Sequence, residues 1–180
     1  IMTAYPIHTT ESAPEGSKPL VDAVAKKMGF VPNLIGVLAE APAALETYLG
    51  VMDIFERSSL NHAEKQTVLL SASIVNNCTY CMAAHSTLAV MKKVPSQIIE
   101  ALRDGTPLPD PKLEALAALT RSIVETRGWP TQETQQAFFA ATLKGTAVDE
   151  VQRMRDIAIA SISTQEMVGI TGGYWFETIT

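Results

Sequence analysis

Apolar residues recur every three or four positions along most of the chain, from about residue 20 to about residue 168. This spacing is typical of helices that bury one face, whereas strands alternate apolar and polar residues. No stretch alternates in that way, and Ala and Leu dominate over Thr and the aromatic residues. The pattern predicts an all-α protein, a compact helical bundle with helices over residues 20–28, 34–38, 42–55, 62–75, 78–91, 95–104, 111–127, 131–144 and 148–168.

Local start and stop signals support several of these boundaries. The run Asn61-His62-Ala63-Glu64 has the form of a capping box, in which Asn61 caps the helix and Glu64 reaches back to it. Asp110 before Pro111 is an N-cap followed by proline at the first helical position. Gly29 is placed to end the helix before it.

Three segments are expected along the chain. Residues 1–19 contain three prolines and several small polar residues, which is typical of an extended arm. Residues 20–170 are expected to form a single all-α domain, and residues 171–180 a tail. A proline-containing linker at 104–111 would divide the domain into two halves that pack together.

Composition narrows the class of protein. Of the 180 residues, 47% are hydrophobic, which is enough for a buried core. Nineteen acidic and 14 basic residues give a net charge of −5, so we do not expect a nucleic-acid partner, which requires a basic footprint. No apolar run reaches the roughly 18 residues that cross a bilayer, and no signal peptide is visible. We therefore expect a cytoplasmic protein without a membrane partner.

One cluster of side chains points to chemistry, and it consists of Cys78, Cys81 and His85. On a helix, Cys81 lies about 300° and His85 about 340° around the axis from Cys78, so the three share one face. A thiolate near a helix N-terminus is stabilised by the helix dipole. His85, one turn beyond Cys81, can accept its proton or hold the thiolate as an ion pair. The spacing predicts a dithiol redox site in a reducing compartment.

Two other interpretations of this cluster stay open. The cysteines can be small buried apolar residues without any chemistry. A metal site would use Cys78, Cys81 and His85 as three ligands and would need a fourth, for which the other histidines are His8 and His62. We favour redox chemistry, with no metal and no other cofactor.

Beyond this cluster, the chain resembles the carboxymuconolactone decarboxylase family in its alkyl hydroperoxidase D-like (AhpD-like) branch. The resemblance rests on residues 60–66 (LNHAEKQ), which lead through an apolar helix into residues 77–86 (NCTYCMAAHS). Residues 29–34 (GFVPNL) and 41–45 (APAAL) are similar to the family as well. The resemblance implies an AhpD-like helical fold, assembly into trimers or hexamers, and thiol-dependent reduction of a hydroperoxide.

The resemblance also implies roles for the three residues of the cluster. In the family's mechanism the second cysteine attacks the peroxide and the first resolves the sulfenic acid, which corresponds to Cys81 and Cys78 here. His85 would belong to the proton relay. The helix dipole favours Cys78 as the attacking residue instead. If Asn77 caps the helix, Cys78 is the first helical residue and would be the more acidic thiol. We expect attack by Cys81, since the leaving oxygen needs a proton and His85 lies one turn away.

Two positions depart from the family pattern. A glutamate often stands twelve residues before the first cysteine as the terminal base of the relay, but that residue is Gln66 here, and its amide cannot accept a proton. Glu64 is close by and is expected to serve in the capping box. Tyr80 lies between the cysteines, where some hydroperoxidases have a histidine, and a tyrosine donates a hydrogen bond rather than accepting a proton. Gln66, Glu64 and Tyr80 are thus supporting relay candidates in a slow peroxidase.

The sequence therefore predicts a thiol-dependent peroxidase whose partners are a hydroperoxide and an unidentified thiol or disulfide reductant. A homo-oligomer (trimer, hexamer or dimer) is expected, because the apolar residues from Val68 to Val75 would bury surface against another copy. A decarboxylase-like lyase is an alternative, although it would need cationic groups rather than a redox pair. Another alternative is a non-catalytic helical oligomer, anchored by the aromatic residues 174–176.

Overall fold

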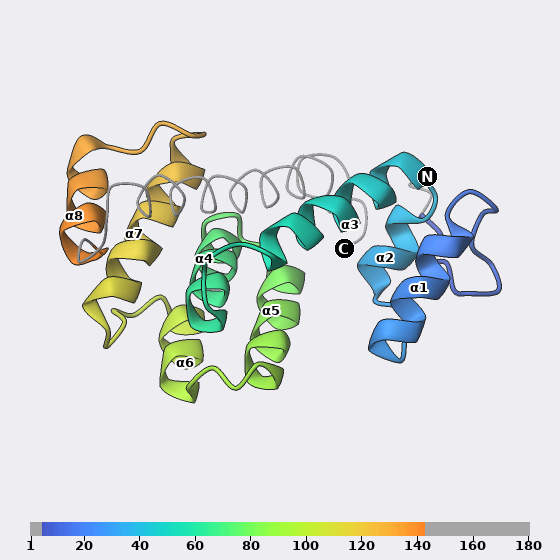
Figure 1. Cartoon of the computed structure of the whole chain (residues 1–180), viewed down its shortest axis with the longest axis horizontal. Helices are drawn as coiled ribbons and strands as arrows, with labels where there is room; N and C mark the ends of the chain where they lie inside the picture. The colour runs from blue at the N-terminus through green and yellow to red at the C-terminus, as the bar shows by residue number, and fades with distance from the viewer. Residues whose placement is uncertain (1–4, 143–180) are drawn as a thin grey trace. The chain divides into compact units, whose positions relative to one another are not determined.

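The computed structural model describes residues 5–142 of the chain, which are built from α-helices. This part contains eight α-helices and no strand (Figure 1), so the all-α prediction is confirmed for it. The expected helix over 148–168 and the aromatic residues 174–176 lie outside the described residues. The helices are α1 (Lys18–Met28), α2 (Asn33–Leu38), α3 (Pro42–Glu56), α4 (His62–Val75), α5 (Thr79–Met91), α6 (Ser96–Asp104), α7 (Pro111–Glu125) and α8 (Gln132–Thr142).

The described residues fall into two compact units. Residues 5–56 hold α1 to α3, and residues 57–142 hold α4 to α8. Each unit has its own buried apolar side chains, among them Val21, Leu45 and Phe55 in the first and Val68, Leu70, Leu116 and Leu119 in the second. Both cysteines and His85 belong to the second unit. The division of the chain into an arm, one domain and a tail stays a prediction.

Helix α4 is the central element of the second unit. It packs against α5, α6 and α7 (Figure 1), and every residue from Glu64 to Ser73 is buried. Val68 and Leu70 have no exposed surface at all. Of the apolar stretch that was expected to bury surface against a second copy, residues 68–72 are already buried in one chain, whereas Ile74 and Val75 are half-buried. Burial in one chain therefore weakens the physical reason given for assembly.

Several predicted helix ends are present. Gly29 and Gly105 adopt left-handed backbone angles, with φ of 84° and 66°, and close α1 and α6. The Asp110 side chain accepts a hydrogen bond from the Lys112 backbone N–H at 2.9 Å and caps α7, whose first residue is Pro111. The sequence therefore locates these boundaries through local backbone chemistry.

Residues before α1 are held against α2 by specific contacts. The His8 backbone N–H donates to the Gly36 carbonyl at 3.1 Å, and the His8 ring lies 2.6 Å from a carboxylate oxygen of Glu40. The buried Ser17 hydroxyl donates to the Ala39 carbonyl at the end of α2. These contacts fix the segment preceding α1 within the first unit.

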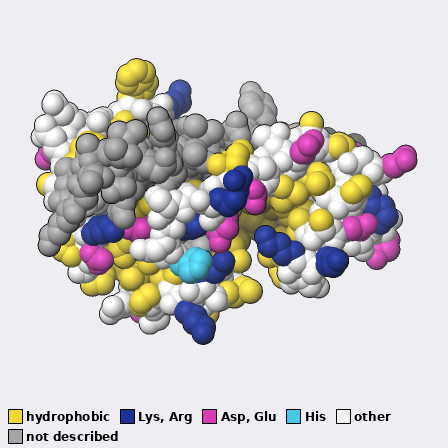
Figure 2. Space-filling model, in the orientation of Figure 1, with side chains coloured by type: hydrophobic (Ala, Val, Ile, Leu, Met, Phe, Trp, Pro, Cys, Tyr) yellow, Lys and Arg dark blue, Asp and Glu magenta, His cyan; other side chains and the backbone are white. Residues whose placement is uncertain are grey.

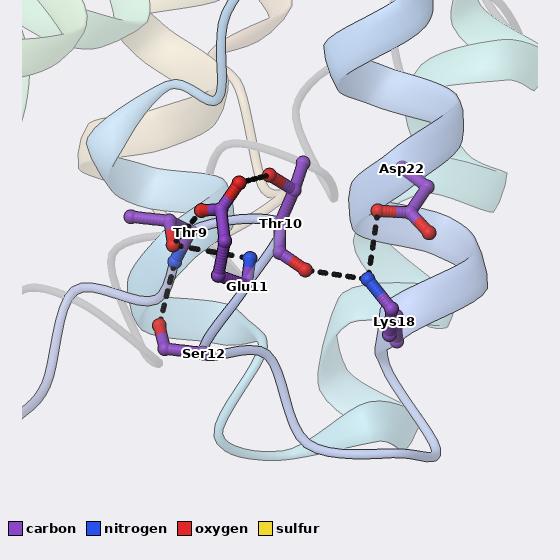
Figure 3. A network of polar contacts seen from close by, with 6 residues as sticks. All are labelled: Thr9, Thr10, Glu11, Ser12, Lys18 and Asp22. Atoms are coloured by element: carbon purple, nitrogen blue, oxygen red, sulfur yellow. Dashed lines mark hydrogen bonds and ion pairs between the residues drawn. The ribbon is translucent and has the colours of Figure 1, made fainter.

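A small polar network stabilises the turn that follows His8 (Figure 3). The Glu11 carboxylate accepts hydrogen bonds from the hydroxyls of Thr10 and Thr9, each at 2.6 Å, and these bonds lower the pKa of Glu11 to about 2. Lys18, in the first turn of α1, donates to the Thr10 carbonyl and pairs with Asp22. The turn is thereby tied to the start of α1.

Gly36→Ala should loosen the segment around His8 and destabilise the protein. A Cβ at this position would lie 2.6 Å from the His8 carbonyl oxygen and 2.8 Å from the Ile7 side chain, so backbone must move. Overpacking of this kind costs about 1–3 kcal/mol. Gly50→Ala is the matched control, because nothing lies within 4 Å of its Cβ inside α3, and it should stabilise by about 0.5–1 kcal/mol. Urea unfolding of the two variants measures the difference, and equal effects would contradict the contact at Gly36.

Candidate active site

The candidate site begins where the turn between α4 and α5 ends. Asn77 adopts a left-handed conformation with φ of 51°, and the chain enters α5 with Cys78 as the N-cap and Thr79 as the first helical residue. The expectation that Asn77 caps this helix is therefore wrong by one position. Asparagine tolerates the left-handed conformation, so Asn77 reverses the chain, and the capping position passes to Cys78.

The sulfur of Cys78 performs the capping. It accepts a hydrogen bond from the Cys81 backbone N–H, with an N–S distance of 3.2 Å. Free N–H groups at a helix N-terminus favour negative charge, so this contact stabilises a Cys78 thiolate when the site is reduced.

Cys78 and Cys81 are joined by a disulfide, with their Cα atoms 5.3 Å apart. The bond spans the first turn of α5, as the spacing of the two cysteines allows. The two sulfur-bearing residues differ in access, because Cys81 is only 8% exposed whereas Cys78 is half-buried. Oxidation therefore joins a more accessible sulfur to a buried one.

His85 lies one turn after Cys81 on α5 and is 4% exposed. Burial disfavours the charged imidazolium and lowers the pKa of His85 to about 4. Its ring is therefore neutral at neutral pH, and the same burial makes it a weaker base than a free histidine. The buried Nδ1 atom has no hydrogen-bond partner in the described protein.

Of the relay candidates, Gln66 lies on the helix that packs against α5. It is 7% exposed, and its side-chain oxygen is buried without a hydrogen-bond partner in the described part of the chain. Tyr80 lies in the first turn of α5 and is half-buried. The helices thus bring Gln66 into the same packed hairpin as the disulfide and His85.

Glu64 is fully engaged in holding the start of α4. Its carboxylate accepts a hydrogen bond from the Asn61 backbone at 2.8 Å, and the Asn61 side chain accepts one from the Glu64 backbone at 3.0 Å, so the predicted capping box is confirmed. The other carboxylate oxygen lies 2.6 Å from the Lys112 ammonium group. Lys112 is in the first turn of α7, where the helix dipole disfavours a positive charge. The negative charge of Glu64 offsets this unfavourable interaction.

The described part of the chain offers neither a metal cluster nor a membrane-spanning helix as a competing feature. Basic and acidic side chains are interspersed on the face drawn in Figure 2. In residues 5–142, no group of three or more His, Cys, Asp or Glu side chains is arranged to hold a metal ion. None of the helices in the same range is both long and apolar enough to span a membrane.

Comparison with known proteins relates part of the chain to one family and its fold to solved structures. Residues 39–122 match the carboxymuconolactone decarboxylase family, whereas no curated protein matches the chain. A similar solved structure is the alkylhydroperoxidase AhpD core of an uncharacterized peroxidase-related protein from Ralstonia eutropha JMP134. Its TM-score is 0.72 at 18% identity, over 93% of this chain and 89% of that chain. An uncharacterized peroxidase-related protein from Silicibacter sp. TM1040 has a TM-score of 0.72 at 17% identity, over 93% of this chain and 87% of that chain. Residues 39–122 therefore match the carboxymuconolactone decarboxylase family, and the fold of the chain is AhpD-like.

Proposed function

We propose that the protein is a thiol-dependent peroxidase that reduces a hydroperoxide through Cys81 and Cys78. The observation that carries this proposal is the Cys78–Cys81 disulfide, which is formed one turn from a buried, neutral histidine. A disulfide between a half-buried and a buried cysteine is the expected product of a two-thiol peroxidase cycle. The peroxidase-related proteins of the same fold are consistent with this proposal.

The proposed cycle has two steps that use no cofactor. The Cys81 sulfur attacks one peroxide oxygen, the O–O bond breaks, and the other oxygen leaves as an alcohol after it gains a proton. Cys81 is then a sulfenic acid, and the Cys78 sulfur attacks it to form the disulfide while water leaves. An external thiol reductant returns two electrons and two protons to the disulfide.

His85 is proposed to manage the proton in the first step. Its neutral ring accepts the Cys81 proton as the sulfur attacks and returns a proton to the leaving oxygen. This role favours Cys81 over Cys78 as the attacking residue, although Cys78 receives the helix N–H contact. The uncharged stretch from Gln66 to Met91 supports a redox role over a decarboxylase role, since it offers no cation to bind a carboxylate.

Titration of free thiols tests the proposal directly. The reduced protein should show two thiols, and one equivalent of a hydroperoxide should remove both without forming a crosslink between chains. Thiols that persist after the peroxide is added would contradict the proposed function. The proposal also includes a homo-oligomer, which the family resemblance supports, and a cytoplasmic location, where a pair of thiols can be kept reduced.

Gln66→Glu should speed the peroxidase about tenfold. A carboxylate can accept the proton passed through His85, whereas the native amide can only orient a neighbour. The gain is limited because burial at this position, 7% exposed, raises the pKa of a new carboxyl group. Peroxide consumption with dithiothreitol as reductant measures the effect. Gln97→Glu, at an exposed position on α6, adds the same charge as a control. An unchanged or lower rate, with both cysteines still redox-active, would show that residue 66 is not the base position.

A further inference from the structure

A serine, a histidine and a glutamate come together in the first unit, whereas both cysteines belong to the second. The ring of His8 contacts the other two side chains. Its Nε2 atom lies 2.6 Å from a carboxylate oxygen of Glu40, and its Nδ1 atom lies 3.4 Å from the hydroxyl oxygen of Ser12. A hydroxyl, an imidazole and a carboxylate in this order are the parts of a nucleophilic hydrolase site. The proposed peroxidase cycle uses none of them.

The two contacts of the His8 ring determine which nitrogen carries its hydrogen. An ionised carboxylate only accepts hydrogen bonds, so in the neutral ring the Nε2 hydrogen points to Glu40 and Nδ1 has the lone pair. The hydroxyl oxygen of Ser12 already accepts the Thr9 backbone N–H at 2.9 Å (Figure 3), which leaves the hydroxyl hydrogen to point at Nδ1. The ring is therefore placed to take the Ser12 proton.

The nearby carboxylate of Glu11 does not compete with Glu40 for the His8 ring. Each carboxylate oxygen of Glu11 accepts one hydroxyl hydrogen bond at 2.6 Å, one from Thr9 and one from Thr10 (Figure 3). These bonds satisfy the Glu11 charge within its own turn. Glu40 is therefore the carboxylate that orients the ring, and it acts as a positioning residue.

The base and the hydroxyl are held by different parts of the backbone. The His8 N–H donates to the Gly36 carbonyl on α2 at 3.1 Å, and the absence of a Cβ at residue 36 allows this close approach. Ser12 lies in a turn that the Ala13 N–H closes by donating to the Thr9 carbonyl at 3.0 Å. Groups that are already aligned lose less entropy when they react together.

The serine is accessible, whereas the base is sheltered. Ser12 is exposed, and the side chain of His8 is 12% exposed. Within residues 5–142, the Ser12 backbone N–H donates no hydrogen bond. In serine hydrolases the N–H of the nucleophilic serine is one of the donors that stabilise the oxyanion. A carbonyl compound from solvent can thus reach the hydroxyl with a hydrogen-bond donor beside it.

We propose that Ser12, His8 and Glu40 form an acyl-transfer site that cleaves small esters with a good leaving group. The Ser12 oxygen bonds to the ester carbonyl carbon while its proton passes to Nδ1 of His8, and Glu40 stabilises the imidazolium. The proton then goes to the departing alcohol oxygen as the ester C–O bond breaks, which leaves an acyl-serine. Water, deprotonated by the same ring, cleaves the acyl-serine to a carboxylic acid and restores the hydroxyl.

Acylation of the oxidised protein tests this site without any reaction at a thiol, because the disulfide joins both cysteines. With p-nitrophenyl acetate, mass spectrometry after an acid quench should find the acetyl group on Ser12. Release of p-nitrophenol should be about a hundredfold faster than in Ser12→Ala. Ser96→Ala removes an exposed serine at the start of α6 and should keep the native rate. A native rate in Ser12→Ala, or an acetyl group found only on other residues, would overturn the proposal.

Variants of His8 and Glu40 separate chemistry from structure. His8→Gln should slow p-nitrophenol release as much as Ser12→Ala does, because no base remains. Glu40→Gln can still accept the Nε2–H bond but lacks the charge, so kcat should fall about tenfold while KM stays unchanged. His62→Gln, which removes an exposed imidazole at the start of α4, should keep the native rate. A native rate in His8→Gln would overturn the site, and a native kcat in Glu40→Gln would overturn the role of the carboxylate.

Discussion

Replacing Cys81 with serine should reduce peroxide consumption to the uncatalysed rate and should prevent formation of a sulfenic acid. Cys78→Ser should still form a sulfenic acid that a dimedone-type reagent can trap, because the attacking sulfur and His85 are both retained. It should nevertheless lose turnover, since no resolving thiol remains. Mass spectrometry of the trapped adduct, with the native protein as the reference, measures the outcome.

The structure also gives a reason for the opposite result, in which Cys78 and not Cys81 attacks the peroxide. Cys78 is the N-cap of α5, and its sulfur accepts the Cys81 backbone N–H at 3.2 Å, which favours its thiolate. If Cys81→Ser forms the sulfenic acid and Cys78→Ser does not, stabilisation of the thiolate outweighs the proximity of His85. Cys78 would then be the attacking residue, and the proposed roles of the two cysteines would be reversed.

Acidification should destabilise the folded protein through His85 by about 3 kcal/mol between pH 6.5 and pH 4. The pKa of a free histidine is 6.5, whereas burial lowers the pKa of His85 to about 4. Below pH 6.5 the unfolded chain therefore binds a proton that the folded chain does not, and the free energy of unfolding falls. The stabilising contribution is complete above pH 6.5 and is lost as the pH falls through 4.

His85→Gln isolates this contribution because glutamine does not titrate. Urea unfolding of the native protein and the variant at several pH values gives the difference in slope, with the other titrating groups cancelling. His62→Gln is the control, since it makes the same substitution at an exposed position at the start of α4. Parallel profiles for the native protein and His85→Gln would show that the imidazole is not held neutral by burial.

Local chemistry made much of the fold predictable. The Asn61–Glu64 capping box, the Asp110 cap and the glycine at residue 29 each depend on residues that are neighbours in the sequence. The common face of Cys81 and His85 follows in the same way from the period of one helix. Features of this kind need no knowledge of tertiary structure.

Contacts between distant segments could not be predicted in this way. The pairing of Glu64 with Lys112 joins the starts of two helices, and nothing local to Lys112 indicates its partner. The apolar stretch from Val68 was interpreted as an interface because the sequence does not show that α5, α6 and α7 surround α4. The one-residue error at Cys78 arose because the backbone angle of Asn77 depends on how the two helices meet.

The disulfide spans so few residues that its reduction has a limited effect on the stability of the fold. Cys78 and Cys81 are three residues apart, so the bond closes a loop of only a single helical turn. In the chain-entropy description, so small a loop restricts the unfolded chain by about 2 kcal/mol, against a typical total stability of about 5–15 kcal/mol. Opening the bond therefore lowers the free energy of unfolding by less than the typical total. In the proposed cycle, a protein of typical total stability would therefore remain folded when the bond is reduced.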